Sequence, residues 1–201
     1  MLVLGHEWRL SLASGMRAAR ISCLVGLATM LFSLSLGAEE TSVIAEAETK
    51  YWQEVFQGKR IVEMELSFTA RAWQAMQPAA GQGQPGGFPR GDENRFEYAR
   101  ASLKIDGSQL DDVGARFKGN SSYRSSQRGF KRPFKIDTNR FVKELKWQGR
   151  TKLNLSNSFK DASYLREKLG YEVFQAAGLS VPGVGWVHLT LTVEGEVAKR
   201  D

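Results

Sequence analysis

The chain has 201 residues, of which 42% are hydrophobic and 25% are charged, and its formal net charge is +6. This composition excludes a disordered polyelectrolyte and is that of one globular domain with a core. A single cysteine and two histidines exclude an internal disulfide and a Cys/His zinc cluster.

Residues 1–38 have the order of a secretory signal. Arg17 and Arg20 precede an apolar run over residues 21–36, which ends at small residues. About 16 residues are fewer than the roughly 20 that span a bilayer. We therefore expect a signal peptide and an extracytoplasmic protein, secreted, periplasmic or in the cell envelope, with a membrane anchor as the alternative. The acidic residues 39–57 are expected to be a linker, either a short helix or a tether.

The first folded segments predict a strand and a helix. Apolar and polar residues alternate from Ile61 to Phe68, as in a half-buried strand. Residues 70–76 predict one or two helical turns with Trp73 and Met76 facing inward. Residues 77–95 are rich in proline and glycine and predict a mobile loop inserted in the domain.

The segments that follow predict an antiparallel meander. Asp106-Gly107 is typical of a tight hairpin turn between two strands. The expected strands of the meander are residues 96–105, 113–117, 134–137, 150–155 and 186–193. The sequence therefore predicts an α+β fold.

One main helix is expected to pack on this sheet. It would begin near Asp161 or Ser163, which are suitable N-caps, and would end before Gly178. The apolar face expected to pack contains Leu165, Leu169, Val173 and Phe174.

The positive charge is concentrated in one stretch. Twelve Lys or Arg residues and two acidic residues lie between Arg116 and Lys152, so this stretch has ten excess positive charges. A surface of that sign attracts phosphate, nucleic acid or an acidic protein surface.

A turn in this stretch is a candidate phosphate site. Lys118, Gly119, Asn120, Ser121 and Ser122 offer a lysine, hydroxyls and backbone N–H groups. Such a group of donors suits phosphate oxygens. The alternative is an ordinary hairpin turn, in which Gly and Asn are common.

Lys135 is a second candidate, because it is expected in the middle of a strand and opposite to its apolar neighbours. A lysine on a rigid strand is what a nucleotide kinase uses to hold phosphates, and a solvated strand face is the alternative. Glu167 on the following helix would pair with Lys135, or would be a surface charge beside Arg166 and Lys168.

Several blocks of the chain follow one another in a distinctive order and spacing. They are Val113–Ser122, Lys131–Phe141, Lys152–Asn157, Asp161 with Leu165–Leu169, and Ala177–Pro182, preceded by Lys59–Leu66 and Trp73–Met76. In this arrangement the chain resembles the CotH (spore coat protein H) kinase family over roughly residues 58–193.

The resemblance implies an atypical protein kinase that transfers phosphate from ATP, with Mg²⁺ or Mn²⁺, to Ser residues of extracytoplasmic proteins. The implied fold is the N-terminal lobe of a protein-kinase-like fold, with a meander-like sheet and one main packing helix. Carried over, Lys118 to Ser122 contribute to the phosphate-facing turn, and Lys135 is the nucleotide lysine. Glu167 and Arg166 would lie on the helix that braces Lys135.

The chain departs from the family's pattern in its carboxylates. Phosphoryl transfer needs carboxylates for the metal and for the attacking hydroxyl, and in the family these come from a later half. No pair among the aspartates of the first half is typical of a metal site. We therefore expect a truncated gene that encodes the nucleotide-binding part and is inactive alone.

Two other functions are compatible with the basic stretch. The first is a secreted binding or adhesion module that docks an acidic protein or wall polymer. The second is nucleic-acid binding. The predicted export and the lack of a recognition motif argue against it.

Overall fold

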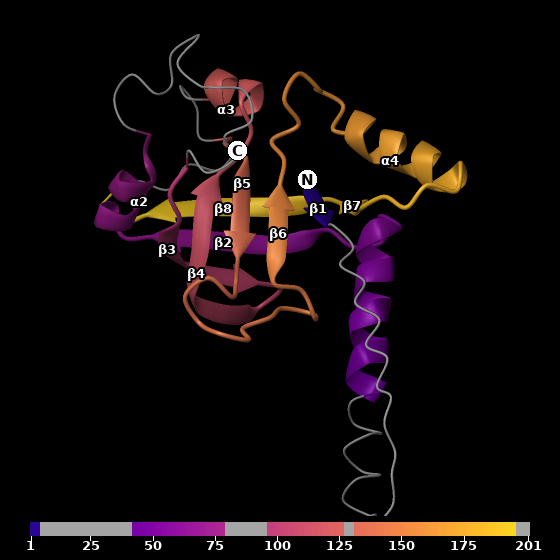
Figure 1. The fold of residues 1–201 in the computed structure, drawn as a ribbon, viewed down its shortest axis with the longest axis horizontal. Helices are drawn as coiled ribbons and strands as arrows, with labels where there is room; N and C mark the ends of the chain where they lie inside the picture. Colours follow the sequence, from indigo (N-terminus) through magenta and orange to yellow (C-terminus); the bar gives the residue numbers. More distant parts are fainter. Residues whose placement is uncertain (5–41, 79–95, 127–130, 196–201) are drawn as a thin grey trace, which may run out of the picture.

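A computed structural model describes residues 1–4, 42–78, 96–126 and 131–195. Within these ranges the chain has an α+β fold with a curled 8-stranded sheet of order β7-β1-β6-β5-β4-β3-β2-β8 (Figure 1). The strands are β1 (Leu2–Leu4), β2 (Val62–Phe68), β3 (Ala99–Ile105), β4 (Ser108–Phe117), β5 (Phe134–Asp137), β6 (Lys152–Leu155), β7 (Gly183–Gly185) and β8 (Val187–Val193). The helices include α2 (Ala70–Met76), α3 (Ser121–Ser126) and α4 (Arg166–Ala176), and residues 42–56 are also helical.

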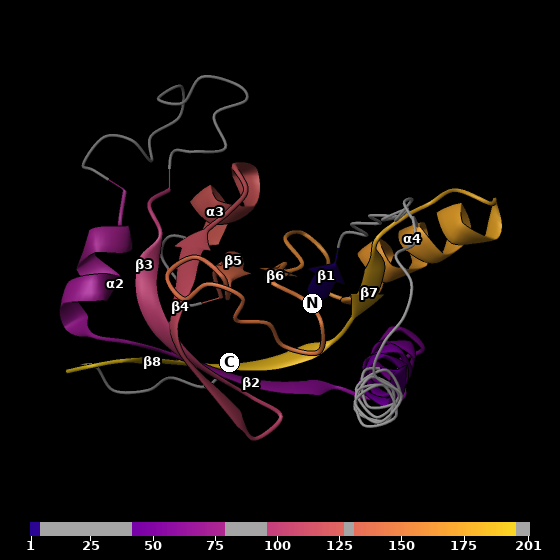
Figure 2. The ribbon, with the colours of Figure 1, turned by 60° about the horizontal axis from the view of Figure 1, so that its bottom comes forward.

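Consecutive strands join the two ends of the sheet. β7 and β8 lie at opposite ends of the strand order, and only Trp186 separates them in the chain. β8 pairs in parallel with β2, and Figure 2 shows these two strands side by side. The other neighbouring strands are antiparallel. The predicted antiparallel meander is thus wrong for β8, because this strand continues directly from β7 and has no hairpin that would return it beside β2.

The core lies on one face of the sheet. Along β2, Met64 and Leu66 belong to an alternating set of buried side chains, as the two-residue period of a strand requires. Phe117 and Phe134 are fully buried, and their ring centroids are 5.3 Å apart. Burial of one such side chain contributes about 1.5–3 kcal/mol.

Two helical segments pack against this core. Trp73 and Met76 of α2 are buried, as predicted, and Thr69 caps this helix by accepting a hydrogen bond from Ala72 N–H. The helix at residues 42–56 contributes the buried side chains of Trp52 and Val55. Part of the predicted linker therefore contributes to the core.

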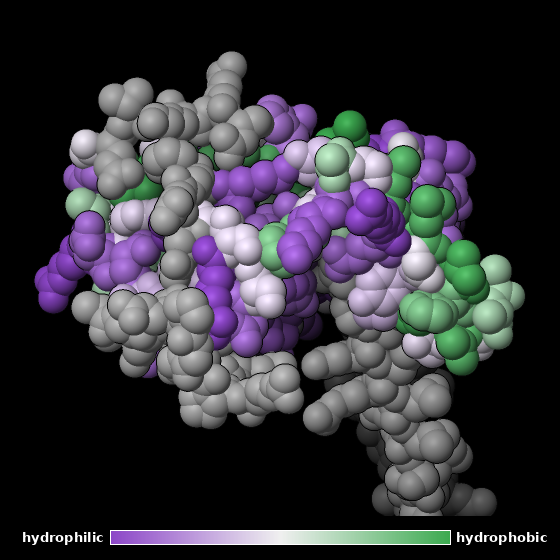
Figure 3. Space-filling model, turned by 90° about the horizontal axis from the view of Figure 1, so that it is seen from above, coloured by the Kyte–Doolittle hydropathy of each residue, from purple (hydrophilic) through white to green (hydrophobic). Residues whose placement is uncertain are grey.

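The predicted helix is present as α4, but it begins at Arg166, and the prediction that its apolar face packs on the sheet is wrong. In α4 the side chains of Leu169, Val173 and Phe174 are 53%, 65% and 50% exposed, and Figure 3 shows hydrophobic residues gathered at the right of the molecule, where Figure 1 places α4. The helix is anchored instead by the buried Lys168, whose ammonium donates to the carbonyl of Phe56 at 2.6 Å. A polar contact with backbone therefore fixes α4, and its apolar face stays in solvent.

The predicted turn at Asp106-Gly107 is present, with φ values of 44° and 83°. These positive angles are those of the tight hairpin turns that match strand twist. The Asp106 carboxylate accepts hydrogen bonds from the Tyr51 hydroxyl at 2.8 Å and from Arg60 at 3.2 Å. Burial and the bond to Asp106 raise the pKa of Tyr51 above its usual range. The turn thus ties residues 42–56 to the sheet.

Two predicted segments lie outside the described residues: 5–38 of the predicted signal or anchor, and 79–95 of the predicted loop. Residues 1–4, by contrast, take part in the sheet through β1. Among the described helices, none has the length and apolar character needed to cross a membrane.

Candidate functional site

Three strands bring a row of polar side chains to one face of the sheet. Arg116 on β4 lies directly across from Lys135 on β5, and Lys135 lies across from Asn154 on β6. Phe117 and Phe134, the next residues in the β4–β5 pair, point into the core. Because strand side chains alternate between faces, the row lies on the face away from the core.

Lys118 continues this row past the end of β4. Its backbone N–H donates to the carbonyl of Pro133 at 3.1 Å, which holds it beside the start of β5. Burial lowers the pKa of the Lys118 amine; Glu167 opposes this shift, whereas Lys135 and Arg116 add to it. We refer to Arg116, Lys118 and Lys135 as the cation cluster. Glu167 is the carboxylate whose field reaches it.

The segment after Lys118 leads into α3, so it is not the hairpin turn considered as the alternative. Gly119 has a φ of +77°, and a Cβ at this position would collide with the hydroxyl of Ser122. The carbonyl of Asn120 accepts a hydrogen bond from the N–H of Arg124 at 3.0 Å. A glycine is therefore required where the chain leaves β4 for the helix.

Asn157 joins the elements around the cluster, and sequence reasoning gave it no role. Its side-chain amide donates to the carbonyls of Ser122 at 3.2 Å and Lys131 at 3.1 Å. Its Oδ1 atom and the hydroxyl of Ser158 are buried without a hydrogen-bond partner among the described residues. Such orphaned groups cost about 1–3 kcal/mol each, and a bound ligand or water would satisfy them. The signal in the sequence was the Asn-Ser pair at 157–158, which one residue separates from the end of β6.

Comparison with known proteins identifies the segment that carries this site. Residues 115–197 match the family model described as CotH kinase protein. The match covers less than half of the chain, and over this segment the sequence is similar to the CotH kinase family. The match runs from β4 through β8 and contains Lys118, Lys135 and Glu167. No curated protein and no solved structure matches the chain.

The CotH segment brings some of the predicted site residues together and keeps one apart. Lys118 and Lys135 share the cation cluster, and the field of Glu167 acts on Lys118. Among the described residues no ion pair within 4.0 Å joins Glu167 to Lys135. Arg166 is directed elsewhere: its side chain is 77% exposed and donates to the carbonyl of Lys160 at 3.0 Å.

Asp161 sets the start of the helix that carries Glu167. Its carboxylate accepts a hydrogen bond from the backbone N–H of Arg166 at 2.9 Å and another from the hydroxyl of Ser163. Both bonds lower the pKa of Asp161, and the bond from Ser163 has the larger effect. The prediction of Asp161 or Ser163 as the N-cap residue is thus wrong, because the helix begins at Arg166 and its N-cap residue is Leu165, although the Asp161 carboxylate binds the N–H of Arg166.

The side chains of the cation cluster suit phosphate oxygens better than they suit a metal ion. Arg and Lys side chains on rigid strands donate charge-assisted hydrogen bonds to phosphate oxygens, and the cation cluster supplies three of them. A divalent cation needs several oxygen ligands. Among the described residues, no group of three His, Cys, Asp or Glu side chains could hold one.

A groove of about 580 Å³ includes the orphaned groups, and none of Arg116, Lys118 and Lys135 lines it. It is lined by Met1, Lys131, Asn157, Ser158, Tyr164 and His188, among others. The Lys131 ammonium donates a hydrogen bond to the Tyr164 hydroxyl, so the two side chains lie together at this groove. The groove thus offers hydrogen-bonding groups beside Lys131, a basic residue outside the cation cluster.

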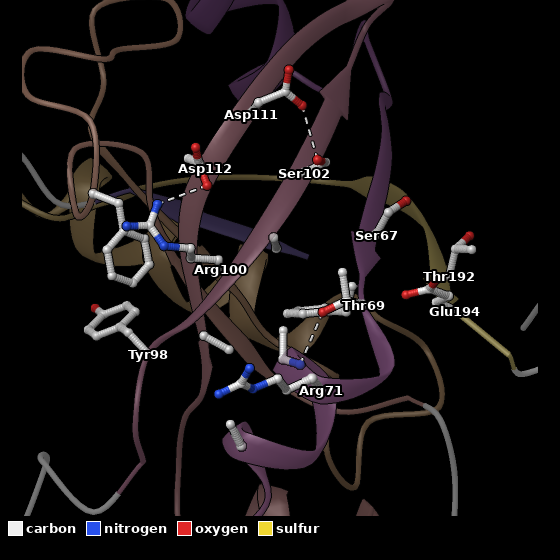
Figure 4. A pocket seen from close by; sticks show the side chains of 16 residues that line it. Ser67, Thr69, Arg71, Tyr98, Arg100, Ser102, Asp111, Asp112, Thr192 and Glu194 are labelled. Carbon is white, nitrogen blue, oxygen red and sulfur yellow. Dashed lines mark hydrogen bonds and ion pairs between the residues drawn. The ribbon is translucent and has the colours of Figure 1, made fainter.

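A larger groove of about 980 Å³ lies elsewhere on the sheet, beside α2 (Figure 4). Two of its acidic groups already have partners: Arg100 donates to Asp112 at 2.8 Å, and Ser102 donates to Asp111 at 3.0 Å. Like the smaller groove, it is lined by none of the residues of the cation cluster. The lining of neither groove therefore identifies it as the site of the phosphate chemistry.

Proposed function

We propose that the CotH segment is the nucleotide-binding part of an atypical protein kinase, with a fold equivalent to the N-terminal lobe of a kinase. The full reaction would transfer the γ-phosphate of ATP to Ser residues of extracytoplasmic proteins. The observation that best supports this proposal is the cation cluster, in which Arg116 on β4 lies directly opposite Lys135 on β5. Like charges in that position are destabilising, and a polyphosphate relieves the repulsion.

Each residue of the site has a role in this proposal. Lys135 and Lys118 hold phosphate oxygens, and the backbone N–H groups of Gly119–Ser122 add donors next to them. Glu167 supports Lys118 through its negative field, which opposes the lowering of the lysine pKa. A bound Mg²⁺ or Mn²⁺ would neutralise phosphate charge. Its carboxylate ligands would come from outside the described residues, because these hold no suitable group.

Titration calorimetry of the full chain with ATP tests nucleotide binding. Lys135→Ala is expected to weaken binding at least tenfold, which corresponds to about 1.4 kcal/mol. Lys104→Ala is the matched control, because Lys104 is an exposed strand lysine on β3 outside the cluster. Equal affinity in the wild type and Lys135→Ala, or no heat with any nucleoside triphosphate, would contradict the proposal.

The transfer step has a separate assay. Purified protein is incubated with γ-labelled ATP, Mg²⁺ or Mn²⁺ and a Ser-rich acceptor protein, and incorporated label is counted. We expect the label to be lost in Lys135→Ala and retained in Lys104→Ala. Label that persists in Lys135→Ala would remove this residue from its role.

A basic binding module is the second candidate, and a different set of cations favours it. Lys143 and Lys146 are exposed in the connection between β5 and β6. They are available to an acidic protein or wall polymer. Tight binding of polyphosphate or an acidic polymer without any binding of ATP would favour this module over the kinase.

Export is part of the proposal. Residues 1–38 would direct the protein out of the cytoplasm, as a cleaved signal or as an anchor. Mass spectrometry of the protein recovered from the medium or the cell envelope tests this, because cleavage would place the new N-terminus near Glu39.

A further inference from the structure

The first residues of the chain fill a position inside the sheet. β1 lies between β6 and β7 and is antiparallel to both (Figures 1 and 2). Leu2 is 0% exposed and lies directly across from the buried Leu155. Met1 and Ser156 exchange two backbone hydrogen bonds, of 2.8 and 3.1 Å. Three residues of β1 thus complete a sheet whose next strand, β2, begins at Val62.

β1 lies between the strands β6 and β7, and both of these strands are held in place by contacts other than those with β1. We refer to this position, between β6 and β7, as the strand slot. β6 pairs along its other side with β5. β7 is pressed against the helix at residues 42–56, because a Cβ at Gly183 would collide with Phe56 and one at Gly185 with Val55. Lys168 of α4 also donates to the carbonyl of Val184 at 3.4 Å. Without β1, two fixed strand edges would face each other across the width of one strand.

Two facing edges of this kind bind an extended peptide well. Each edge presents unpaired N–H and C=O groups, and strand addition satisfies them by main-chain hydrogen bonds. A peptide in the slot would pair on both of its sides, whereas a peptide on an ordinary sheet edge pairs on one. The pocket for the side chain of Leu2 would select an aliphatic residue.

Burial at one end of the slot disfavours a charged residue there. Met1 is 8% exposed, and burial is the main cause that lowers the pKa of its amine to about 6. An uncharged residue would therefore be favoured at this position. Beyond it lies the groove with the orphaned Asn157 Oδ1 and Ser158 hydroxyl, which would meet the upstream backbone of a peptide.

We propose that the strand slot binds an extended segment of the protein substrate, with an aliphatic residue at the position of Leu2 and an uncharged residue one position before it. The proposal rests on the proposed function and on export, because removal of residues 1–38 would take β1 out of the slot. The acceptor serine would then lie upstream, toward the cation cluster. In the unprocessed chain β1 occupies the slot and keeps substrate out.

Fluorescence anisotropy of labelled peptides, without nucleotide, tests the slot. The probe is Ser-Met-Leu-Val-Leu, and the control peptides are Ser-Met-Asp-Val-Leu and Ser-Lys-Leu-Val-Leu. The protein is the full chain with Leu2→Asp, which expels β1 by placing a carboxylate at a buried position. We expect the probe to bind at least tenfold tighter than either control. Equal binding of the three peptides overturns the proposal.

A covalent lock provides the matched protein control. Val3 lies directly opposite Val184, so Val3→Cys with Val184→Cys, in a Cys23→Ser background, would join β1 to β7 by a disulfide. The oxidised protein is expected to bind no probe, and binding by the oxidised protein overturns the proposal. Circular dichroism establishes that each variant is folded. If Leu2→Asp unfolds, Leu2→Ala takes its place, and absence of selective binding by that folded variant counts against the slot.

The slot and the kinase activity fail in different ways. ATP binding and transfer without selective peptide binding overturn the slot alone. Selective peptide binding without any ATP binding overturns the proposed function, and with it the assignment of the peptide as a phosphorylation substrate.

Discussion

Arg116 and Lys135 lie directly opposite each other in the β4–β5 pair, on the face of the sheet away from the core. Two cations in this position repel each other across the ladder and cost a few tenths of a kcal/mol or more. An anion bound between the two side chains would remove this repulsion. The free energy of unfolding should therefore depend on the anions present.

The first prediction concerns this pair. Lys135→Ala should leave the free energy of unfolding unchanged or raise it by up to about 1 kcal/mol, because it removes the repulsion. Pyrophosphate should raise the Tm of the wild type more than that of Lys135→Ala. Thermal unfolding with and without pyrophosphate measures both effects. Lys104→Ala is the control, and an equal Tm shift in all three proteins would refute the prediction.

The second prediction concerns the pH dependence contributed by Lys118. Its pKa is lower in the folded protein than the ordinary 10.5, chiefly because of burial. Between the folded and unfolded pKa values the unfolded chain binds more protons, so this lysine makes stability rise with pH in that window. Lys118→Met should therefore be more stable than the wild type at pH 7, and the difference should shrink as pH approaches 10.5. Urea unfolding of both proteins from pH 7 to 10.5 measures it, and a difference that stays constant with pH would contradict burial of the amine as its cause.

The third prediction concerns the contact between β7 and the helix at residues 42–56. Gly185→Ala should destabilise the protein by about 1–3 kcal/mol, because its Cβ would overlap a Val55 methyl group and approach the Val55 carbonyl. Gly170→Ala is the control: it lies within α4, and a Cβ there meets nothing within 4 Å. That change should stabilise by about 0.5–1 kcal/mol through helix propensity. Chemical denaturation distinguishes the two, and a neutral Gly185→Ala would mean that β7 is not held by this helix.

The fourth prediction compares two phenylalanines. Phe134→Ala should cost about 3–5 kcal/mol, because Phe134 is fully buried in the core. Phe174→Ala should change stability by less than about 0.5 kcal/mol, since Phe174 on α4 is 50% exposed. Equal losses in urea unfolding would show that the face of α4 is covered in solution.

The parts of the fold that were predictable are those set by local chemistry. The Asp-Gly turn at 106–107 needs two positive φ values, and few residue pairs supply them. The alternation along β2 and the two inward residues of α2 follow from a single buried face. The blocks around Lys118 and Lys135 were sufficient to indicate the family that residues 115–197 match.

The parts that were missed depend on contacts between distant segments. β1 has three residues, too few to show a period, and it pairs with Asn154 and Leu155 far along the chain. The parallel pairing of β8 depends on the curl of the sheet, which no short pattern records. The apolar spacing of α4 was typical of a packing face, but the fold holds this helix by Lys168 instead. Asn157 was missed because no spacing rule predicts a side chain that bridges α3 and the residues just before β5.

The late position of β8 in the chain, directly after Trp186, has a consequence for the order of folding. The outer edge of β2 finds its partner only in β8, from Val187 to Val193. During synthesis this edge therefore waits for more than a hundred further residues, and pairings of such long sequence separation form slowly. A nascent chain would expose a hydrophobic strand edge over that interval, and chaperone binding should decline once residue 193 has left the ribosome.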